Sequence, residues 1–218
     1  MTPTSASVGV GGIGPVAESL YSETGPIPPT PTLALVGVTD GYDAPPMALQ
    51  GEGELLLVGA RSLAGDAEAR LGGSEYLAQF GGTDRFPESL ADPDAFVDTL
   101  VEVANEASTL ATHDVSHGGL AVTLAEMVSE EAGVSVDLDA PTGGTPEALL
   151  FGEQAGRVVV ETTDPRSVRQ AFDGVAPVYD LGTADDSGRL DVALDGESLS
   201  YDAVEITELR DVIERELA

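Results

Sequence analysis

One stretch of the chain, His113–Met127, constrains the fold more than any other. It reads H-D-V-S-H-G-G-L-A-V-T-L-A-E-M, so a polar cluster passes through Gly118 and Gly119 directly into an amphipathic helix. Four apolar residues share one face of that predicted helix: Leu120, Leu124, Met127 and Val128. The first N–H groups of a helix lack partners inside it, and glycines let a ligand approach the backbone closely. The stretch therefore predicts a phosphate-binding or nucleotide-binding junction.

The polar cluster has a second interpretation, in which Ser116 caps a loop while His113 and Asp114 hold a turn. His113 and His117 are the only histidines and lie four residues apart, but the glycines begin only after His117. A shared helical face is therefore not expected, and we predict no metal ligands there. No Ser-His-Asp arrangement can be assembled from spacing alone, so no catalytic residue is assigned to the chain.

A second glycine pair precedes another short predicted helix, within L-G-G-S-E-Y-L from Leu71. Gly72 and Gly73 stand before Ser74, which is a suitable N-cap, and the N–H groups behind it could face a phosphate. A tight turn with a good cap explains the same residues without a ligand. The two junctions together give the predicted nucleotide-binding set: Gly72, Gly73, Ser74, His113, Asp114, Ser116, Gly118 and Gly119.

A polar insertion interrupts an apolar region at L-F-G-E-Q-A-G-R-V-V-V, from Leu150. Glu153 there could hold a magnesium ion or a substrate amine, because hard cations prefer oxygen ligands. Pairing of Glu153 with Arg157 at the end of a strand is the commoner arrangement for such residues. The insertion predicts a possible polar site at these two residues.

Charge restricts the class of partner. The chain has 39 acidic and 9 basic residues, all nine of them Arg, and a formal net charge of −30 at pH 7. Salt at about 1 M screens such repulsion within ~3 Å, which favours a halophilic protein in a salt-loaded cytoplasm. Nine scattered Arg residues cannot form a basic face, so no nucleic-acid partner is expected. No apolar run is long enough to span a bilayer, and the N-terminal residues lack the basic-then-apolar pattern of a secretory signal, so no membrane partner is expected.

Helical and strand patterns are interleaved along the sequence. Residues 26–32 are too rich in proline for a helix and predict an extended connector. A helix is expected to start at Asp92 and Pro93 and to end near His113. Other predicted elements are strands at 33–38, 54–60, 134–138, 157–162, 178–181 and 190–194 and helices at 166–172 and near the C-terminus. This pattern predicts an α+β domain with layered α-β-α architecture from about residue 50 onward.

Together these motifs, with L-Y-S-E-T-G-P-I-P-P-T-P from Leu20, resemble the large synthetase subunit, subunit II, of phosphoribosylformylglycinamidine synthase. The H-D-V-S-x-G-G-L element is shared more widely, as in aminoimidazole ribonucleotide synthetase. The resemblance implies a C-terminal domain of the aminoimidazole ribonucleotide synthetase-like type at residues 49–218. It also implies a remnant of the N-terminal-type domain at 19–48, after an unmatched glycine-rich segment at 1–18.

The function that this resemblance implies is an ATP-dependent ligase reaction of purine biosynthesis. The family converts formylglycinamide ribonucleotide, ATP and glutamine-derived ammonia to formylglycinamidine ribonucleotide, with Mg2+ as a further cofactor of the complete enzyme. The implied partners are the missing N-terminal half, a glutaminase subunit, a small bridging subunit and small-molecule substrates.

The sequence departs from the family in ways that limit activity. The family's catalytic His and ATP-contacting Lys lie in its first half, and this chain contains no Lys. Where the family carries G-N-V-S, only Ser19 remains, as the implied substrate-binding residue. We therefore expect a C-terminal portion that is inactive alone. The alternative is a nucleotide-binding, phosphate-binding or structural module that associates with other synthase subunits.

Overall fold

The computed structural model describes residues 44–59, 70–138, 145–194 and 196–211, together with the backbone of two short strands near the N-terminus. The chain separates into two compact units, Met1–Gly41 and Tyr42–Ala218. In the first unit, β1 (Tyr21–Ser22) pairs antiparallel with β2 (Gly25–Pro26). The predicted strand at 33–38, the segment 1–18 and Ser19 lie outside the described residues.

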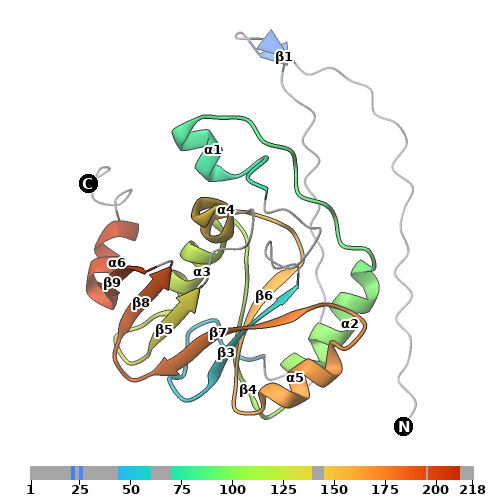
Figure 1. Ribbon diagram of the computed structural model, residues 1–218, viewed down its shortest axis with the longest axis vertical. Coiled ribbons are helices and arrows are strands. Elements are labelled where there is room, and N and C mark those ends of the chain that lie inside the picture. Colours follow the sequence, from blue (N-terminus) through green and yellow to red (C-terminus); the bar gives the residue numbers. More distant parts are fainter. Residues whose placement is uncertain are drawn as a thin grey trace. The chain divides into compact units, whose positions relative to one another are not determined.

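The second unit is built on a seven-stranded mixed sheet with the order β4-β6-β3-β7-β5-β8-β9 (Figure 1). Its strands are β3 (Glu54–Gly59), β4 (Thr109–Asp114), β5 (Gly133–Leu138), β6 (Arg157–Thr162), β7 (Val178–Asp185), β8 (Arg189–Leu194) and β9 (Glu197–Asp202). Neighbouring strands are antiparallel, except that β5 and β8 are parallel.

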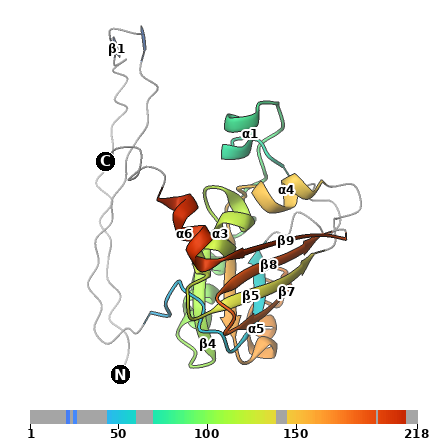
Figure 2. The same cartoon turned by 90° about the vertical axis from the view of Figure 1, so that its left-hand side faces the viewer.

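Helices cover both faces of the sheet (Figure 2). They are α1 (Glu75–Phe80), α2 (Pro93–Ala104), α3 (Gly119–Met127), α4 (Pro146–Phe151), α5 (Pro165–Ala171) and α6 (Ala203–Arg210). Helices α2, α4 and α5 begin in the same way: an Asp or Thr side chain accepts from the backbone N–H three residues later, and Pro follows the cap. Proline suits this position because its missing N–H would be unpaired there anyway.

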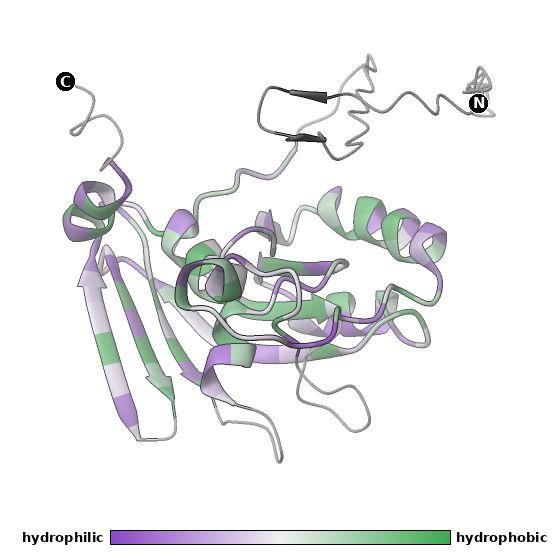
Figure 3. Ribbon diagram, turned by 90° about the horizontal axis from the view of Figure 1, so that it is seen from above, coloured by the Kyte–Doolittle hydropathy of each residue, from purple (hydrophilic) through white to green (hydrophobic). Residues whose placement is uncertain are grey.

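The core has two layers, and β3 lies between them. Leu55 and Leu57 pack with α3, α4 and α6, whereas Leu56 and Val58 pack with α2 and α5. Strand β5 instead alternates buried and exposed residues, since the other face of the β5-β8-β9 half is open, and Figure 3 shows polar residues along these outer strands. A strand covered on both faces reads as a continuous apolar run, and one covered on a single face alternates. The predicted layered α-β-α fold is confirmed.

One predicted helix is wrong at its C-terminal end. Helix α2 stops at Ala104 instead of continuing to His113, and residues 109–114 form β4 at the edge of the sheet. Asn105 Nδ2 donates to the Val101 carbonyl at 2.6 Å, and Thr109 Oγ1 donates to the Val103 carbonyl at 2.7 Å, which satisfies carbonyls at the helix end. Pairing with β6 then outweighs the local helical spacing of the apolar residues.

Several other elements agree with the predictions or add to them. The predicted strands at 134–138, 157–162 and 190–194 are present, and β7 is longer than predicted. Helix α4 and strand β9 were not predicted. None of the helices in the described part of the chain has the length and apolar character that a bilayer crossing requires.

Candidate functional site

The carboxylate of Glu153 joins the two glycine junctions. Glu153 lies in the loop between α4 and β6, and its Oε1 accepts from the backbone N–H of Glu75 at 2.8 Å and of Gly118 at 2.9 Å. Glu75 is the first residue of α1, and Gly118 is the N-cap of α3. The Glu153 side chain remains 14% exposed. Three motifs that are distant in the sequence therefore meet at one carboxylate.

Aromatic packing positions α1 over α4. The rings of Tyr76 and Phe151 stack with their centroids 5.2 Å apart and an interplanar angle of 19°. Phe151 is the last residue of α4, two residues before Glu153, and Tyr76 follows Glu75 directly. The stack therefore holds the Glu75 amide within reach of the Glu153 carboxylate.

The glycines of the α3 junction are required by the packing of the chain itself. Gly118 and Gly119 have φ of +81° and +69°, in the left-handed region that favours glycine. A Cβ on Gly119 would lie 2.6 Å from the Leu150 carbonyl oxygen and 2.8 Å from that of Gly152. The close approach that the sequence suggested for a ligand is made here by the C-terminal end of α4.

The first junction is similar. A Cβ on Gly72 would lie 2.1 Å from the Arg85 carbonyl oxygen, and one on Gly73 would lie 2.6 Å from the ring of Phe86. Ser74 caps α1, because its Oγ accepts from the Leu77 N–H at 3.4 Å. The capped-turn interpretation of this junction is therefore present in the structure, together with the contact from Glu75 to Glu153.

Ser116 does not cap α3. Its hydroxyl donates to Asp114 Oδ2, and α3 begins without a side-chain cap from a residue nearby. The Gly119 N–H donates to the Ser116 carbonyl at 3.0 Å, which leaves the Gly118 N–H to Glu153. Glu153 thus replaces a local cap with one that comes from 35 residues away.

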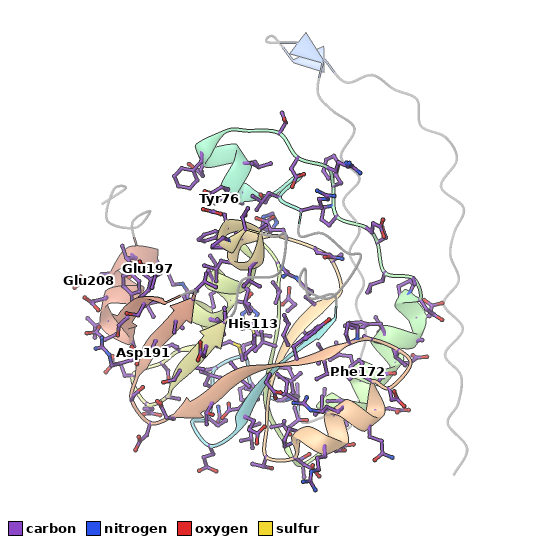
Figure 4. The ribbon with its side chains drawn as sticks, viewed as in Figure 1. Tyr76, His113, Phe172, Asp191, Glu197 and Glu208 are labelled. Atoms are coloured by element: carbon purple, nitrogen blue, oxygen red, sulfur yellow. The ribbon has the colours of Figure 1, made fainter. Side chains whose placement is uncertain are left out.

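The two histidines lie in different surroundings. His113 is on β4 with its side chain only 10% exposed, and its Nε2 lies 3.4 Å from Glu126 Oε2 on α3. Figure 4 shows it among the central elements, away from Tyr76 on α1. His117 is 85% exposed, and its Nδ1 lies 3.6 Å from Glu75 Oε1 and 4.0 Å from Glu153 Oε2. Within the described ranges, no group of three or more His, Asp or Glu is placed to hold a metal ion.

Arg157 is the least satisfied charged residue of the site. It begins β6 and is 1% exposed, with Nη2 donating to the Gly152 carbonyl. Its Nε and Nη1 have no hydrogen-bond partner in the described part of the chain. Burial lowers the pKa of Arg157 to about 10, and the nearby Glu153 charge offsets part of that effect. The alternative in which Glu153 pairs with Arg157 is not what the structure shows, since no salt bridge joins these two described side chains.

Sequence reasoning missed one fully buried carboxylate. Glu161 on β6 is 0% exposed and accepts from the N–H groups of Gln50 at 2.7 Å, Glu52 at 3.0 Å and Gly53 at 3.2 Å. The available signal was an acid inside the otherwise apolar run R-V-V-V-E-T. A buried carboxylate must be hydrogen-bonded, so the run itself indicates a distant set of donors.

Comparison with known proteins identifies the fold family. Residues 51–195 match the family described as "AIR synthase related protein, C-terminal domain". The chain belongs to this family. The match includes β3 to β8 and α1 to α5, so every contact of Glu153 described above lies within the AIR synthase related domain.

Curated relatives are subunits of one enzyme. The phosphoribosylformylglycinamidine synthase subunit PurL of Haloarcula marismortui is 61% identical over 201 residues, which cover 91% of this chain and 28% of that protein. The PurL subunit of Natronomonas pharaonis is 57% identical over 199 residues, covering 89% and 26%. The chain thus spans between a quarter and a third of the length of these two relatives. Both come from haloarchaea, which agrees with the halophilic character predicted from the charge.

Solved structures support the fold. Thermotoga maritima PurL complexed with ATP matches with a TM-score of 0.53 and 14% sequence identity, covering 75% of this chain and 27% of that one. The structure of PurLQS from Thermotoga maritima gives the same values. At this level of identity the comparison establishes the architecture of the AIR synthase related domain, and the residues of its site have to be argued from their own geometry.

Proposed function

We propose that the chain acts in purine biosynthesis as the C-terminal domain of the large subunit of phosphoribosylformylglycinamidine synthase. The complete enzyme would use ATP and ammonia to convert formylglycinamide ribonucleotide to formylglycinamidine ribonucleotide. The observation that carries the proposal is the 61% identity to a PurL subunit over nearly the whole of this chain. Its acidic composition suits the salt-loaded cytoplasm in which we propose that it works.

The junctions around Glu153 are the proposed nucleotide-facing part of the domain. ATP, when bound, supplies the phosphoryl group that activates the substrate, and Mg2+ would accompany it. Support comes from the backbone N–H groups of Glu75 and Gly118, which already bind a carboxylate and therefore suit phosphate oxygens. We propose that contacts to the nucleotide come from Gly72, Gly73, Ser74, His113, Asp114, Ser116, Gly118 and Gly119.

The reacting residues would come from outside this chain. We propose that it functions with the remainder of the large subunit, a glutaminase subunit and a small bridging subunit. Support comes from the Thermotoga maritima structure called PurLQS, a name that joins PurL with further components. Ser19 remains the proposed substrate-binding residue of this chain.

Reconstitution tests this proposal. The chain would be mixed in molar KCl with a polypeptide that supplies the preceding part of the Haloarcula marismortui relative, and formation of formylglycinamidine ribonucleotide from ATP, Mg2+ and ammonia would be measured. Turnover is expected in the mixture and not with either polypeptide alone. An inactive mixture beside an active intact relative would refute the proposed role, and turnover by the chain alone would refute its dependence on the rest of the subunit.

A second candidate function is that of a phosphate-binding or nucleotide-binding module without a role in turnover. It is favoured by the unpartnered Nε and Nη1 of Arg157 beside the Glu153 loop, within the described part of the chain. Calorimetry with ADP and Mg2+ separates the candidates from a purely structural domain. Heat that saturates in the millimolar range supports binding, and the absence of any heat leaves the structural role alone.

A further inference from the structure

The guanidinium of Arg157 lies beside the N-terminus of α3. Its Nη2 donates to the Gly152 carbonyl oxygen, and the same oxygen would lie 2.8 Å from a Cβ on Gly119, the first residue of that helix. A backbone hydrogen bond also places Arg157 near the segment before α3, because the Val115 N–H donates to the Arg157 carbonyl at 2.9 Å. Helix α3 has nine residues, so its free N–H groups attract anions. An incompletely paired cation and a helix N-terminus thus share one small region.

Glu153 can serve either of them, because it binds the Gly118 amide and its charge acts on Arg157. A single oxygen, Oε1, accepts from both amides, whereas the contact to Oε2 is the exposed His117 at 4.0 Å. Arg157 meanwhile keeps two nitrogens without a hydrogen-bond partner in the described residues. A buried charge without partners is unfavourable, and a carboxylate is the side chain that a guanidinium binds best.

We propose that the amides of Gly118 and Glu75 form a binding site for a phosphate group, and that Glu153 occupies it as an exchangeable internal anion. When a phosphate oxygen takes the two amides, the Glu153 carboxylate moves to the guanidinium of Arg157. This inference rests on the phosphate-facing role that the proposed function gives these two junctions, and it adds how Glu153 regulates the site. Binding of phosphate to these amides can be measured without turnover, so failure of the exchange and failure of synthase reconstitution are separate results.

Fewer polar groups are left unpaired after the exchange than before it. With Glu153 on the amides, two nitrogens of Arg157 have no partner among the described residues. With a phosphate on the amides and Glu153 on Arg157, both the helix N-terminus and the guanidinium have an anionic acceptor. The exposed surroundings of His117 and Glu75 give the phosphate access from solvent.

NMR of the amide groups tests the exchange directly. Amide shifts of Gly118 and Glu75 would be followed in molar KCl during titration with inorganic phosphate and, separately, with ADP. Both amides are expected to shift with saturation in the millimolar range. Glu153→Gln should bind phosphate about tenfold more tightly, because a neutral amide oxygen competes less well, and Arg157→Gln about tenfold more weakly. If ADP shifts the same two amides, the bound phosphate group belongs to a nucleotide. If only inorganic phosphate shifts them, the ligand is a free anion.

Glu75→Gln is the matched control. It removes one negative charge from the same place but leaves the Glu153 carboxylate, which accepts from both amides, unchanged. It should change phosphate affinity by about threefold or less, which reports only the general charge effect. Equal effects of Glu153→Gln and Glu75→Gln would overturn the proposal, and so would the absence of saturable shifts at Gly118 in both the unchanged chain and Glu153→Gln. If Arg157→Gln fails to fold, as its own spectrum would show, the comparison of the two Glu variants decides.

Discussion

Two carboxylate clamps each bind several backbone amides, Glu161 on β6 and Glu153 in the loop that precedes β6, and the two differ in how completely their oxygens are used. Glu161 uses both oxygens on three amides of one loop, residues 50–53, and has no exposed surface. Glu153, four residues before Arg157, uses one oxygen on two amides from different junctions and stays partly open. A saturated and buried acid holds the fold, whereas a partly open one beside an unsatisfied Arg is available for exchange.

Removing the buried clamp should have the largest effect. Glu161→Ala removes the acceptor of three backbone N–H groups, one of them buried and two partly buried, so the free energy of unfolding should fall by about 3 kcal/mol or more. Urea unfolding in molar KCl measures this. Glu197→Ala on the exposed edge strand β9 is the control, and it should change stability by about 0.5 kcal/mol or less. Similar values for the two variants would show that Glu161 is not a structural clamp.

Removing the open clamp should cost less. Glu153→Ala should lower the free energy of unfolding by about 1 kcal/mol, because water can replace part of the lost hydrogen bonding at a partly exposed site. The same urea experiment compares it with Glu161→Ala. A loss as large as that of Glu161→Ala would abolish the distinction between the two clamps and count against an exchangeable Glu153.

Replacing the unsatisfied cation should have the smallest effect on stability. Arg157→Met fills a similar volume without a charge, so the free energy of unfolding should change by about 1 kcal/mol or less, with a gain as the favoured direction. Urea unfolding in molar KCl again gives the value. A loss of several kcal/mol would mean that the guanidinium is well paired in the folded chain.

The pH dependence of that variant follows from the lowered pKa of Arg157. Because burial brings this pKa to about 10 in the folded chain, the unfolded chain binds the proton more tightly. The buried, protonated Arg157 therefore lowers the free energy of unfolding in full at neutral pH. This loss is relieved only as the pH rises above the pKa of Arg157 in the folded chain. The stability difference between Arg157→Met and the unchanged chain should stay constant from about pH 6 to about pH 9. A difference that varies across that range would contradict this assignment.

Local chemistry made several elements predictable. The Asp92 and Pro93 pair starts α2 as expected, since the cap needs only an N–H three residues away. The end of α2 was not predictable in this way, because the apolar spacing up to Ala111 suits a helix and only pairing with β6 makes that segment a strand. Helix α4 and strand β9 were not predicted for a related reason, since each is only six residues long and is organised by neighbouring elements.

The candidate site shows the same limit. The motifs at residues 72–74, 113–119 and 153–157 could be recognised one by one, and their order indicated the family that residues 51–195 confirm. Their meeting at one Glu153 oxygen could not be inferred, because it joins groups 35 and 78 residues apart in the sequence. The alternative in which Glu153 pairs with Arg157 relied on their closeness in sequence alone.

The sequence by itself determined the acidic surface chemistry, the capped helix starts and the strand that is buried on both faces, since each depends on residue type and on neighbours within a few positions. Only the tertiary structure decided which amides each carboxylate binds and which buried cation keeps two nitrogens without a hydrogen-bond partner among the described residues. Hydrogen bonds between distant segments depend on the order of strands in the sheet and on the packing of α1 over α4. That order is a property of the whole chain, because every strand must find its place before any one of these contacts can form.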